Sequence, residues 1–285
     1  MKRILFFLFS SVSLFLISCQ KEIDWGTGGT GGGSSSGNLL VKTVSKEGTD
    51  SAVTVYTYNS NQKLINEKIT GRSQGFDVTN ETRYYRNASG IITHYVQINP
   101  NFVIVGIDSV TTYVNYSTAS SRYTSYVSEL GLMGFAVRDS TAIVYNTGGK
   151  VTQTEQYQKI PFLGGDYEIS LRVKYTYDAG GNMSQQDFYT VDPATMAEDL
   201  ISTIKYTFDA KPAAISFDNE AYAIVKPDLI SVNNVTKVEF IDIGTPTNGF
   251  ILNNVYTYNA NNKPGTAVST RTPGPAVSNV TYYYQ

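Results

Sequence analysis

The fold is decided by the stretch Val173-Lys174-Tyr175-Thr176-Tyr177-Asp178-Ala179-Gly180-Gly181-Asn182-Met183, because versions of it return along the chain. The closest copies begin Val55-Tyr56-Thr57-Tyr58-Asn59, Ile204-Lys205-Tyr206-Thr207-Phe208-Asp209 and Val255-Tyr256-Thr257-Tyr258-Asn259. Two weaker copies are Arg83-Tyr84-Tyr85-Arg86-Asn87 and Ile143-Val144-Tyr145-Asn146. Each copy runs into an Asn or Asp, which indicates a chain built from one repeated unit.

Each copy predicts a β-strand that runs into a hairpin turn. Aromatic residues two apart lie on one face of a strand, and the Thr or Lys between them faces the other way. The Asn or Asp that follows can accept hydrogen bonds from the backbone just ahead, while a nearby Gly or Asn tolerates positive φ. We therefore expect one buried face, which carries Tyr175, Tyr177, Tyr206, Phe208, Tyr256 and Tyr258.

The spacing of the turn residues indicates one hairpin per repeat. They stand at positions 59, 87, 146, 178, 209 and 259, so the intervals are 28, 59, 32, 31 and 50. The long second interval predicts a further copy at 113–120, with Ser117 at the turn position. A period of about 30 residues accommodates two strands with their connections. The last interval then contains an irregular insertion.

The chain from Leu39 onward is predicted to form one all-β domain, 39–285. Thr, Ser, Val, Tyr and Asn alternate there between Gly, Asn and Pro turns, without a long helical period. One short helical segment is expected at 192–199, where Pro193 follows a capping Asp. We predict an antiparallel meander of hairpin repeats that forms a closed or nearly closed β-barrel-like sheet. Alternation alone leaves open whether the aromatic face lines the interior or faces lipid.

These repeats resemble the tyrosine-aspartate repeats of Rhs-type proteins. More closely, the chain from about Leu39 onward resembles a family of Gram-negative envelope lipoproteins built around a domain of unknown function that is described as porin-like in fold. The resemblance implies a porin-like fold, and it implies no catalytic or binding residues.

The first 18 residues are predicted to be a lipoprotein signal peptide. Lys2 and Arg3 precede an apolar run that is shorter, at about 14 residues, than the about 20 needed to span a bilayer. The run ends in Leu16-Ile17-Ser18-Cys19, which matches the bacterial lipobox. Cys19, the single cysteine, is therefore predicted to carry lipid such as palmitate and to anchor the protein in the membrane. The alternative is an ordinary signal peptide with an incidental cysteine.

Residues 19–38 are predicted to be the lipidated cysteine and a flexible tether. Only Gly, Thr and Ser occur from 26 to 37, and such a coil reaches roughly 20 Å. Residues 26–31 also fit the dinucleotide-binding fingerprint. The fingerprint requires a preceding strand and a following helix, which the sequence does not indicate, so we predict no cofactor.

Composition argues against nucleic acid as a partner and against a metal site. Charged residues make up 16% of the chain, the formal net charge is −2, and no basic cluster stands out. His94 is the single histidine, and the usual zinc site needs three or four ligands. No loop has the spacing of an EF-hand.

We predict no catalytic residues and no enzymatic activity. Gly71-Arg72-Ser73-Gln74-Gly75 fits the nucleophile-elbow pattern of esterases. That elbow needs a strand before it and a helix after it, whereas both sides of Ser73 are strand-like. Nothing in the sequence favours a carboxylate pair for glycoside hydrolysis, although such residues can lie far apart in a chain.

Three tripeptides resemble an O-glycan acceptor motif of some Gram-negative envelopes: Asp50-Ser51-Ala52, Asp108-Ser109-Val110 and Asp139-Ser140-Thr141. The sequence does not decide whether any of them is modified.

The sequence thus predicts a lipid-anchored outer-membrane protein, with the side of that membrane left open. The favoured hypothesis is a non-enzymatic binding module for a glycan, a small apolar ligand or an envelope protein. The alternatives are a purely structural surface scaffold, an envelope hydrolase and a transmembrane barrel.

Overall fold

The computed structural model describes residues 39–285 apart from 74, 101–106, 108, 133–134, 160–165, 216, 218–219 and 275. The predicted signal peptide, Cys19 and the tether lie outside these residues. The strands are β1 Leu40–Glu47, β2 Asp50–Tyr58, β3 Leu64–Ser73, β4 Phe76–Arg86, β5 Ile92–Ile98, β6 Val110–Ser117, β7 Arg122–Leu132, β8 Phe135–Tyr145, β9 Val151–Lys159, β10 Glu168–Tyr177, β11 Met183–Val191, β12 Glu198–Pro212, β13 Asn233–Asp242, β14 Phe250–Tyr258, β15 Pro264–Thr272 and β16 Val277–Tyr284.

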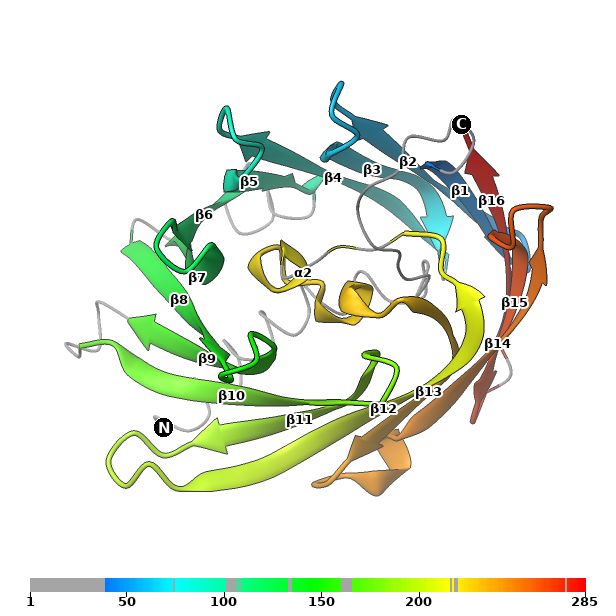
Figure 1. Cartoon of the computed structure of the whole chain (residues 1–285). Coiled ribbons are helices and arrows are strands. Elements are labelled where there is room, and N and C mark those ends of the chain that lie inside the picture. Colours follow the sequence, from blue (N-terminus) through cyan, green and yellow to red (C-terminus); the bar gives the residue numbers. More distant parts are fainter. Residues whose placement is uncertain are drawn as a thin grey trace.

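These strands form a closed antiparallel barrel in which each pairs with its neighbours in sequence (Figure 1). The ring closes where β1 pairs with β16, from Leu40 opposite Tyr284 to Glu47 opposite Ser278. Two further backbone bonds join Leu39 and Gln285, at 3.2 and 3.0 Å. The predicted all-β meander with a closed sheet is confirmed.

The repeated Asn and Asp residues form the predicted turns, all at one end of the barrel, which we call the turn rim. The side-chain oxygen of Asn59 accepts the backbone N–H groups of Asn61 and Lys63, each at 3.0 Å. Asn87, Asn146, Asp178 and Asn259 accept equivalent bonds. The Oγ of Ser117 accepts the N–H of Ser120, so the expected further copy between β6 and β7 is present.

A β-bulge accompanies the turns. The register shifts by one residue just before the last residue of the motif, for example between Thr57 and Tyr58, and this recurs in seven hairpins. On the partner strand Leu64 pairs with Tyr58 and Asn66 with Thr57, so Ile65 is left unpaired. A bulge of this kind strengthens local twist and redirects the backbone groups beside it.

Tyrosine hydroxyls bind the backbone carbonyls that the bulges redirect. The hydroxyls that end β2, β8, β10 and β16 each donate to a carbonyl at the start of the preceding strand. The pairs are Tyr58 with Leu40 at 2.7 Å, Tyr145 with Tyr123 at 2.7 Å, Tyr177 with Val151 at 2.7 Å and Tyr284 with Pro264 at 2.9 Å. In β4, Arg86 replaces the tyrosine and donates Nε–H to the carbonyl of Leu64 at 3.1 Å. These five strand ends are thereby fastened to the preceding strand at the turn rim.

The aromatic face of the repeat points into the lumen. Tyr206 is buried and Phe208 half-buried, while Thr207 between them is exposed. Many charged residues of the strands alternate with inward-facing ones and therefore lie on the outer wall, whereas Glu67, Arg86, Asp139 and Arg271 face the lumen. This outer set includes Lys42, Lys68, Glu81, Arg83, Arg138, Glu155, Arg172, Lys174, Lys205, Lys237 and Glu239. The aromatic face therefore lines the interior of the barrel, a point that the alternation of the sequence left open.

The predicted insertion between 209 and 259 is a plug. The described residues between 213 and 232 lie inside the barrel between the end of β12 and the start of β13, and they include the short helices α2 (Glu220–Ala223) and η3 (Pro227–Ile230). In Figure 1, α2 lies inside the ring of strands. The helix expected at 192–199 is instead a turn, because the Asp192 carboxylate accepts the N–H groups of Ala194 and Thr195 without a helix continuing. A further short helix, η4 (Pro246–Asn248), lies between β13 and β14.

Truncating the inward side chain of the motif should destabilise the barrel far more than truncating the outward one. We expect Tyr206→Ala to cost roughly 3–5 kcal/mol, because it removes a buried ring and leaves a void. Thr207→Ala should change the free energy of unfolding by a few tenths of a kcal/mol to about one. Urea denaturation of the barrel 39–285 measures both. Similar losses from the two variants would contradict the assignment of faces.

Removing one rim hydroxyl should weaken the barrel by a smaller, defined amount. Tyr145→Phe keeps the ring but leaves the carbonyl of Tyr123 without its donor, at an expected cost of about 1–2 kcal/mol. Tyr113→Phe is the matched control, because its ring is 53% exposed on the outer wall and should contribute little. Equal midpoints in urea for the two variants would show that the rim bonds do not stabilise the fold.

Candidate functional site

The plug fills the lumen next to the turn rim and is held there by a buried ion pair. Arg86 and Glu220 form a two-pronged contact, with Nη1 to Oε2 at 2.9 Å and Nη2 to Oε1 at 2.6 Å. Their side chains are only 5% and 13% exposed. A planar guanidinium matches a carboxylate in this geometry, which fixes orientation as well as position. The hydroxyl of Tyr123 also reaches Glu220, at 3.4 Å.

Other contacts hold the rest of the plug against the wall. Lys226 pairs with Glu67 of β3, and the hydroxyls of Tyr222 and Tyr177 are hydrogen-bonded. Tyr222 and Ile224 are buried in the same apolar cluster as inward residues of the strands. Burial raises the pKa of Tyr145 and of Tyr177 to about 12, so these rim hydroxyls remain donors at ordinary pH.

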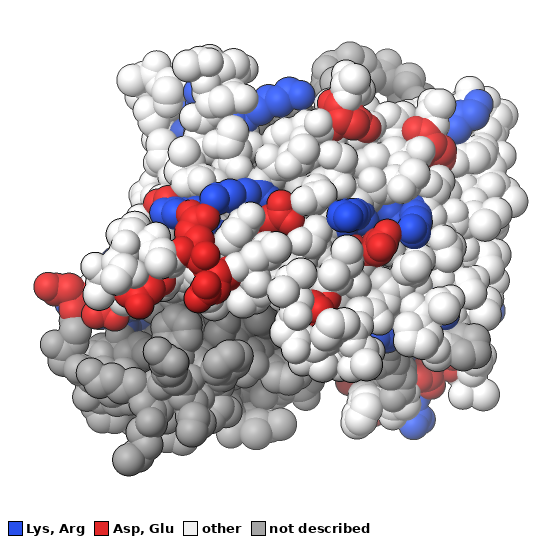
Figure 2. Space-filling view, turned by 90° about the horizontal axis from the view of Figure 1, so that it is seen from below, with Lys and Arg blue, Asp and Glu red and all other residues white. Residues whose placement is uncertain are grey.

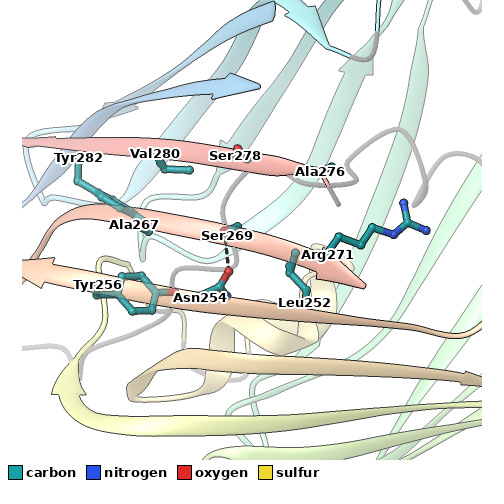
Figure 3. A pocket seen from close by; sticks show the side chains of 10 residues that line it. All are labelled: Leu252, Asn254, Tyr256, Ala267, Ser269, Arg271, Ala276, Ser278, Val280 and Tyr282. Atoms are coloured by element: carbon teal, nitrogen blue, oxygen red, sulfur yellow. Dashed lines mark hydrogen bonds between the residues drawn. The ribbon is translucent and has the colours of Figure 1, made fainter. Parts of the chain in front are cut away.

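A small hollow remains in the lumen wall of β14–β16, with a cavity volume of about 20 Å³ (Figure 3). Four of its lining residues have small side chains: Ala267 and Ser269 on β15, Ala276 just before β16, and Ser278 on β16. Its other lining residues are Leu252, Asn254, Tyr256, Arg271, Val280 and Tyr282. Ligand pockets commonly begin at about 300 Å³, so this hollow is far smaller than a ligand pocket and has room for about one water molecule.

Most polar atoms around the hollow are used within the wall. The amide of Asn254 donates to the carbonyl of Val235 at 2.8 Å and accepts the hydroxyl of Ser269 at 2.6 Å. The hydroxyl of Tyr256 also donates to Val235, at 3.0 Å. Arg271 is the single charged residue of the lining, and its guanidinium carbon lies 4.6 Å from the centre of the Phe250 ring.

A buried carboxylate faces the lumen on a different part of the wall, in β8. Asp139 pairs in register with Ser128 and Gln158, and its Oδ2 accepts the side-chain amide of Gln156 at 2.5 Å. The described residues offer its Oδ1 no hydrogen-bond partner. Burial raises the pKa of the Asp139 carboxyl to about 6, and the bond from Gln156 opposes that rise.

Ser73 and His94 do not come together. Ser73 is the last residue of β3 and pairs with Phe76 at a hairpin. Gly71, two residues earlier on the same face of β3, lies opposite the buried Ala52, so Ser73 is on the inward face. His94 lies on the outer wall, stacked on Tyr85 with ring centres 4.4 Å apart and near Tyr113 at 5.9 Å. The two residues thus lie on opposite faces of the wall.

The described residues contain no group of three or more His, Cys, Asp or Glu side chains placed to hold a metal ion. No described helix has the length and apolar character needed to cross a membrane. Of the three acceptor-like serines, Ser51 is exposed on the outer wall, and Ser109 and Ser140 are half-buried.

The hollow and Asp139 were not identified from the sequence. The hollow depends on small residues in β15 and β16, which read as ordinary strand positions. Asp139 was noted only as part of a modification motif. Its inward position could have been inferred by counting back in twos from Tyr145, the last residue of its repeat.

The outer wall is polar and carries both signs of charge. Glu155, Arg172 and Glu198 form a chain of ion pairs, to which Lys174 adds through Glu198. Figure 2 shows acidic and basic side chains next to one another on the face where β10–β13 lie in Figure 1. Some apolar residues are also exposed, such as Val255 and Val268, which lie opposite each other on β14 and β15.

Comparison with solved structures finds the same architecture in two bacterial proteins. One is a porin-like protein from Bacteroides uniformis, with a TM-score of 0.51 and 11% identity over 86% of this chain and 98% of that chain. The other is a porin-like protein from Bacteroides vulgatus, with a TM-score of 0.53 and 11% identity over 87% and 99%. The barrel fold is shared. No protein-family model and no curated protein matches the sequence.

Neutralising Asp139 should stabilise the barrel at high pH and not at low pH. The folded-state pKa of about 6 lies above the ordinary 3.8, so ionisation disfavours the folded state. The cost is absent below about pH 4 and complete above about pH 7. We expect Asp139→Asn to raise the free energy of unfolding by up to about 2–3 kcal/mol at pH 8.

Urea denaturation of both proteins at pH 4 and pH 8 tests this dependence. Asp199→Asn is the control, since its side chain is exposed. A gain for Asp139→Asn that is equal at both pH values would exclude the proposed electrostatic cost.

Proposed function

We propose that this protein is a lipid-anchored, non-enzymatic binding module of the outer membrane, built as a plugged barrel that is surrounded by water. The proposal rests on the difference between the outer and inner faces of the barrel wall. Many charged and polar side chains lie on the outside, and a plugged lumen with a small hollow lies inside.

The outer wall favours water over lipid as its surroundings. A transmembrane barrel presents an apolar band about 25 Å tall, and Arg or Lys at the middle of the bilayer costs roughly 2–4 kcal/mol. Here Arg172, Lys174 and Lys205 lie on the outer wall, and Arg172 and Lys174 belong to a network of ion pairs with acidic residues. The transmembrane alternative would require these groups to face hydrocarbon.

The position of Leu39 fits an anchor at Cys19. Leu39 is bonded to Gln285 at the turn rim, the end that the plug fills. A tether over 19–38 therefore joins the barrel at its plugged end. The membrane then lies on that side, and the opposite end of the lumen points away from it.

The hydrolase alternative receives no support from Ser73 and His94, since they lie on opposite faces of the wall.

Cutting the tether should separate the protein from the membrane. We expect that a protease site inserted among residues 26–37 allows a specific protease to release the barrel from membranes into solution without detergent. Centrifugation and immunoblotting measure the released fraction, and size-exclusion chromatography of that fraction should give a single monodisperse peak.

The control is Cys19→Ala, which should leave the membrane fraction or accumulate as an unprocessed precursor before any protease is added. Retention of the cut barrel in the membrane would support the transmembrane alternative. Normal processing and membrane attachment of the Cys19→Ala variant would contradict the proposed anchor.

A further inference from the structure

We propose that the turn rim docks on the surface of the membrane, where its lysines contact anionic phospholipid head groups of the phosphatidylglycerol type. The inference rests on the proposed function, because the anchor at Cys19 and the tether bring this end of the barrel to the membrane. Leu39, with which the barrel begins, is bonded to Gln285 at the rim.

Four of the rim turns present a basic side chain. Lys63, Lys150 and Lys263 occupy the same place in three copies of the repeat, since each backbone N–H donates to the side-chain oxygen of the turn Asn at 3.0 Å. Arg122 follows the turn that begins at Ser117. Lys63 and Lys150 are exposed, whereas Arg122 and Lys263 are half-buried. The repeat thus places positive charge around this end of the barrel.

Acidic side chains at the rim neutralise little of this charge. No ion pair among the described residues includes Lys63 or Lys150. Glu67 and Glu220 are already paired with basic side chains of the plug and the wall. In the described part of the chain, Asp178 is the single exposed acidic residue of the rim turns.

The opposite end of the barrel does not suit an anionic surface. Its hairpins and strand ends carry more acidic than basic residues, and Arg72 and Lys159 are paired there with Asp50 and Asp166. Phe76 is 75% exposed at this end and precedes an acidic residue. A negative lipid surface attracts basic segments within about a Debye length, so it favours the rim over this end.

Exposed tyrosines accompany the basic side chains on the outer wall beside the rim. Tyr85 and Tyr283 are 43% and 41% exposed, and each stands one residue before the end of its strand. The ammonium of Lys42 lies 4.0 Å from the centre of the Tyr283 ring, on the strand pair that the tether joins. Tyrosine is enriched at the level of lipid head groups, and the long lysine side chain extends its charge to them.

The spread of the basic groups selects the kind of anion. Arg122 begins β7 and Lys150 immediately precedes β9, so they are two strands apart, and Lys63 before β3 is four strands from Arg122. At about 4.8 Å per strand these separations are roughly 10 and 19 Å along the wall. One compact, multiply charged ligand therefore contacts few of them, whereas a plane of singly charged head groups contacts all.

Binding of the barrel to vesicles tests the contact without the lipid anchor. The probe is the barrel released by cutting the tether, which contains every strand of the closed sheet. It should co-sediment with vesicles of phosphatidylcholine and phosphatidylglycerol, fail to co-sediment with phosphatidylcholine alone, and be released by added salt. The formal net charge of the chain is −2, so net charge does not account for such binding.

Lys63→Gln combined with Lys150→Gln should lower the partition coefficient on the anionic vesicles roughly tenfold or more, because each lysine near such a surface contributes about fivefold. Lys46→Gln combined with Arg72→Gln is the matched control, since both side chains are exposed at the opposite end. It removes the same charge and should change the coefficient less than about twofold, because charges beyond a Debye length from the lipid are screened. An equal loss in the two double variants would overturn the assignment to the rim.

Lysine labelling locates the contact in the whole protein. The full lipidated chain is reconstituted through Cys19 into the same vesicles and treated with an amine-reactive acetylating reagent. Mass spectrometry should show slower acetylation of Lys63 and Lys150 in anionic than in zwitterionic vesicles, with no difference at Lys46. Slower acetylation at Lys46 instead would overturn the orientation.

Failure of this inference is separate from failure of the proposed function. A released barrel that binds neither kind of vesicle, or both equally, overturns the docking of the rim, while the anchored, water-surrounded barrel stands. Tighter binding to vesicles that carry lipid A in place of phosphatidylglycerol, at equal phosphate content, overturns the assignment to singly charged head groups. A barrel that cannot be released from the membrane instead removes the proposed function itself.

Discussion

The bond from a tyrosine hydroxyl to a carbonyl of the preceding hairpin is the contact on which the barrel depends. Ladder hydrogen bonds continue around the ring, but a slip of one residue between hairpins would turn every inward ring outward. The bulge presents a carbonyl in a fixed place, and Tyr58, Tyr145, Tyr177 and Tyr284 each occupy it. At these four places a side chain of the repeat itself helps to fix the register.

Closing sixteen strands creates a second requirement, because a ring of this size encloses more space than its own side chains fill. The plug fills part of that space next to the turn rim. Its ion pair between Arg86 and Glu220 is costly to desolvate, and such a pair contributes more to a defined position than to net stability. Arg86 also takes the place of a rim tyrosine, so one residue fastens a hairpin and holds the plug.

The fold can be predicted from the repeat. The residues outside the repeat carry no comparable signal. Aromatic spacing and the turn residues were sufficient for hairpins, for the hidden copy at Ser117 and for an insertion after Asp209. The closing copy Tyr282-Tyr283-Tyr284-Gln285 was missed because no Asn or Asp follows it. Residues 213–232 carry no helical period that would show a plug.

The candidate site could not be predicted for a related reason. The hollow joins residues of β14, β15 and β16 by register, and its defining feature is the small size of Ala267, Ser269, Ala276 and Ser278. Small residues in a strand carry no chemical signature. Arg271 likewise reads as an ordinary polar strand residue until β15 is placed with that side chain facing the lumen.

The bonds between Leu39 and Gln285 make the two ends of the domain neighbours within the sheet. The backbone hydrogen bonds between β16 and β1 thus resemble those beside a rim turn, although no loop joins these two strands. The strand pairing of the barrel therefore does not depend on which strand comes first in the chain. Joining 285 to 39 through a short linker and opening the chain at the turn after Asn146 yields a circular permutant that preserves every strand pairing.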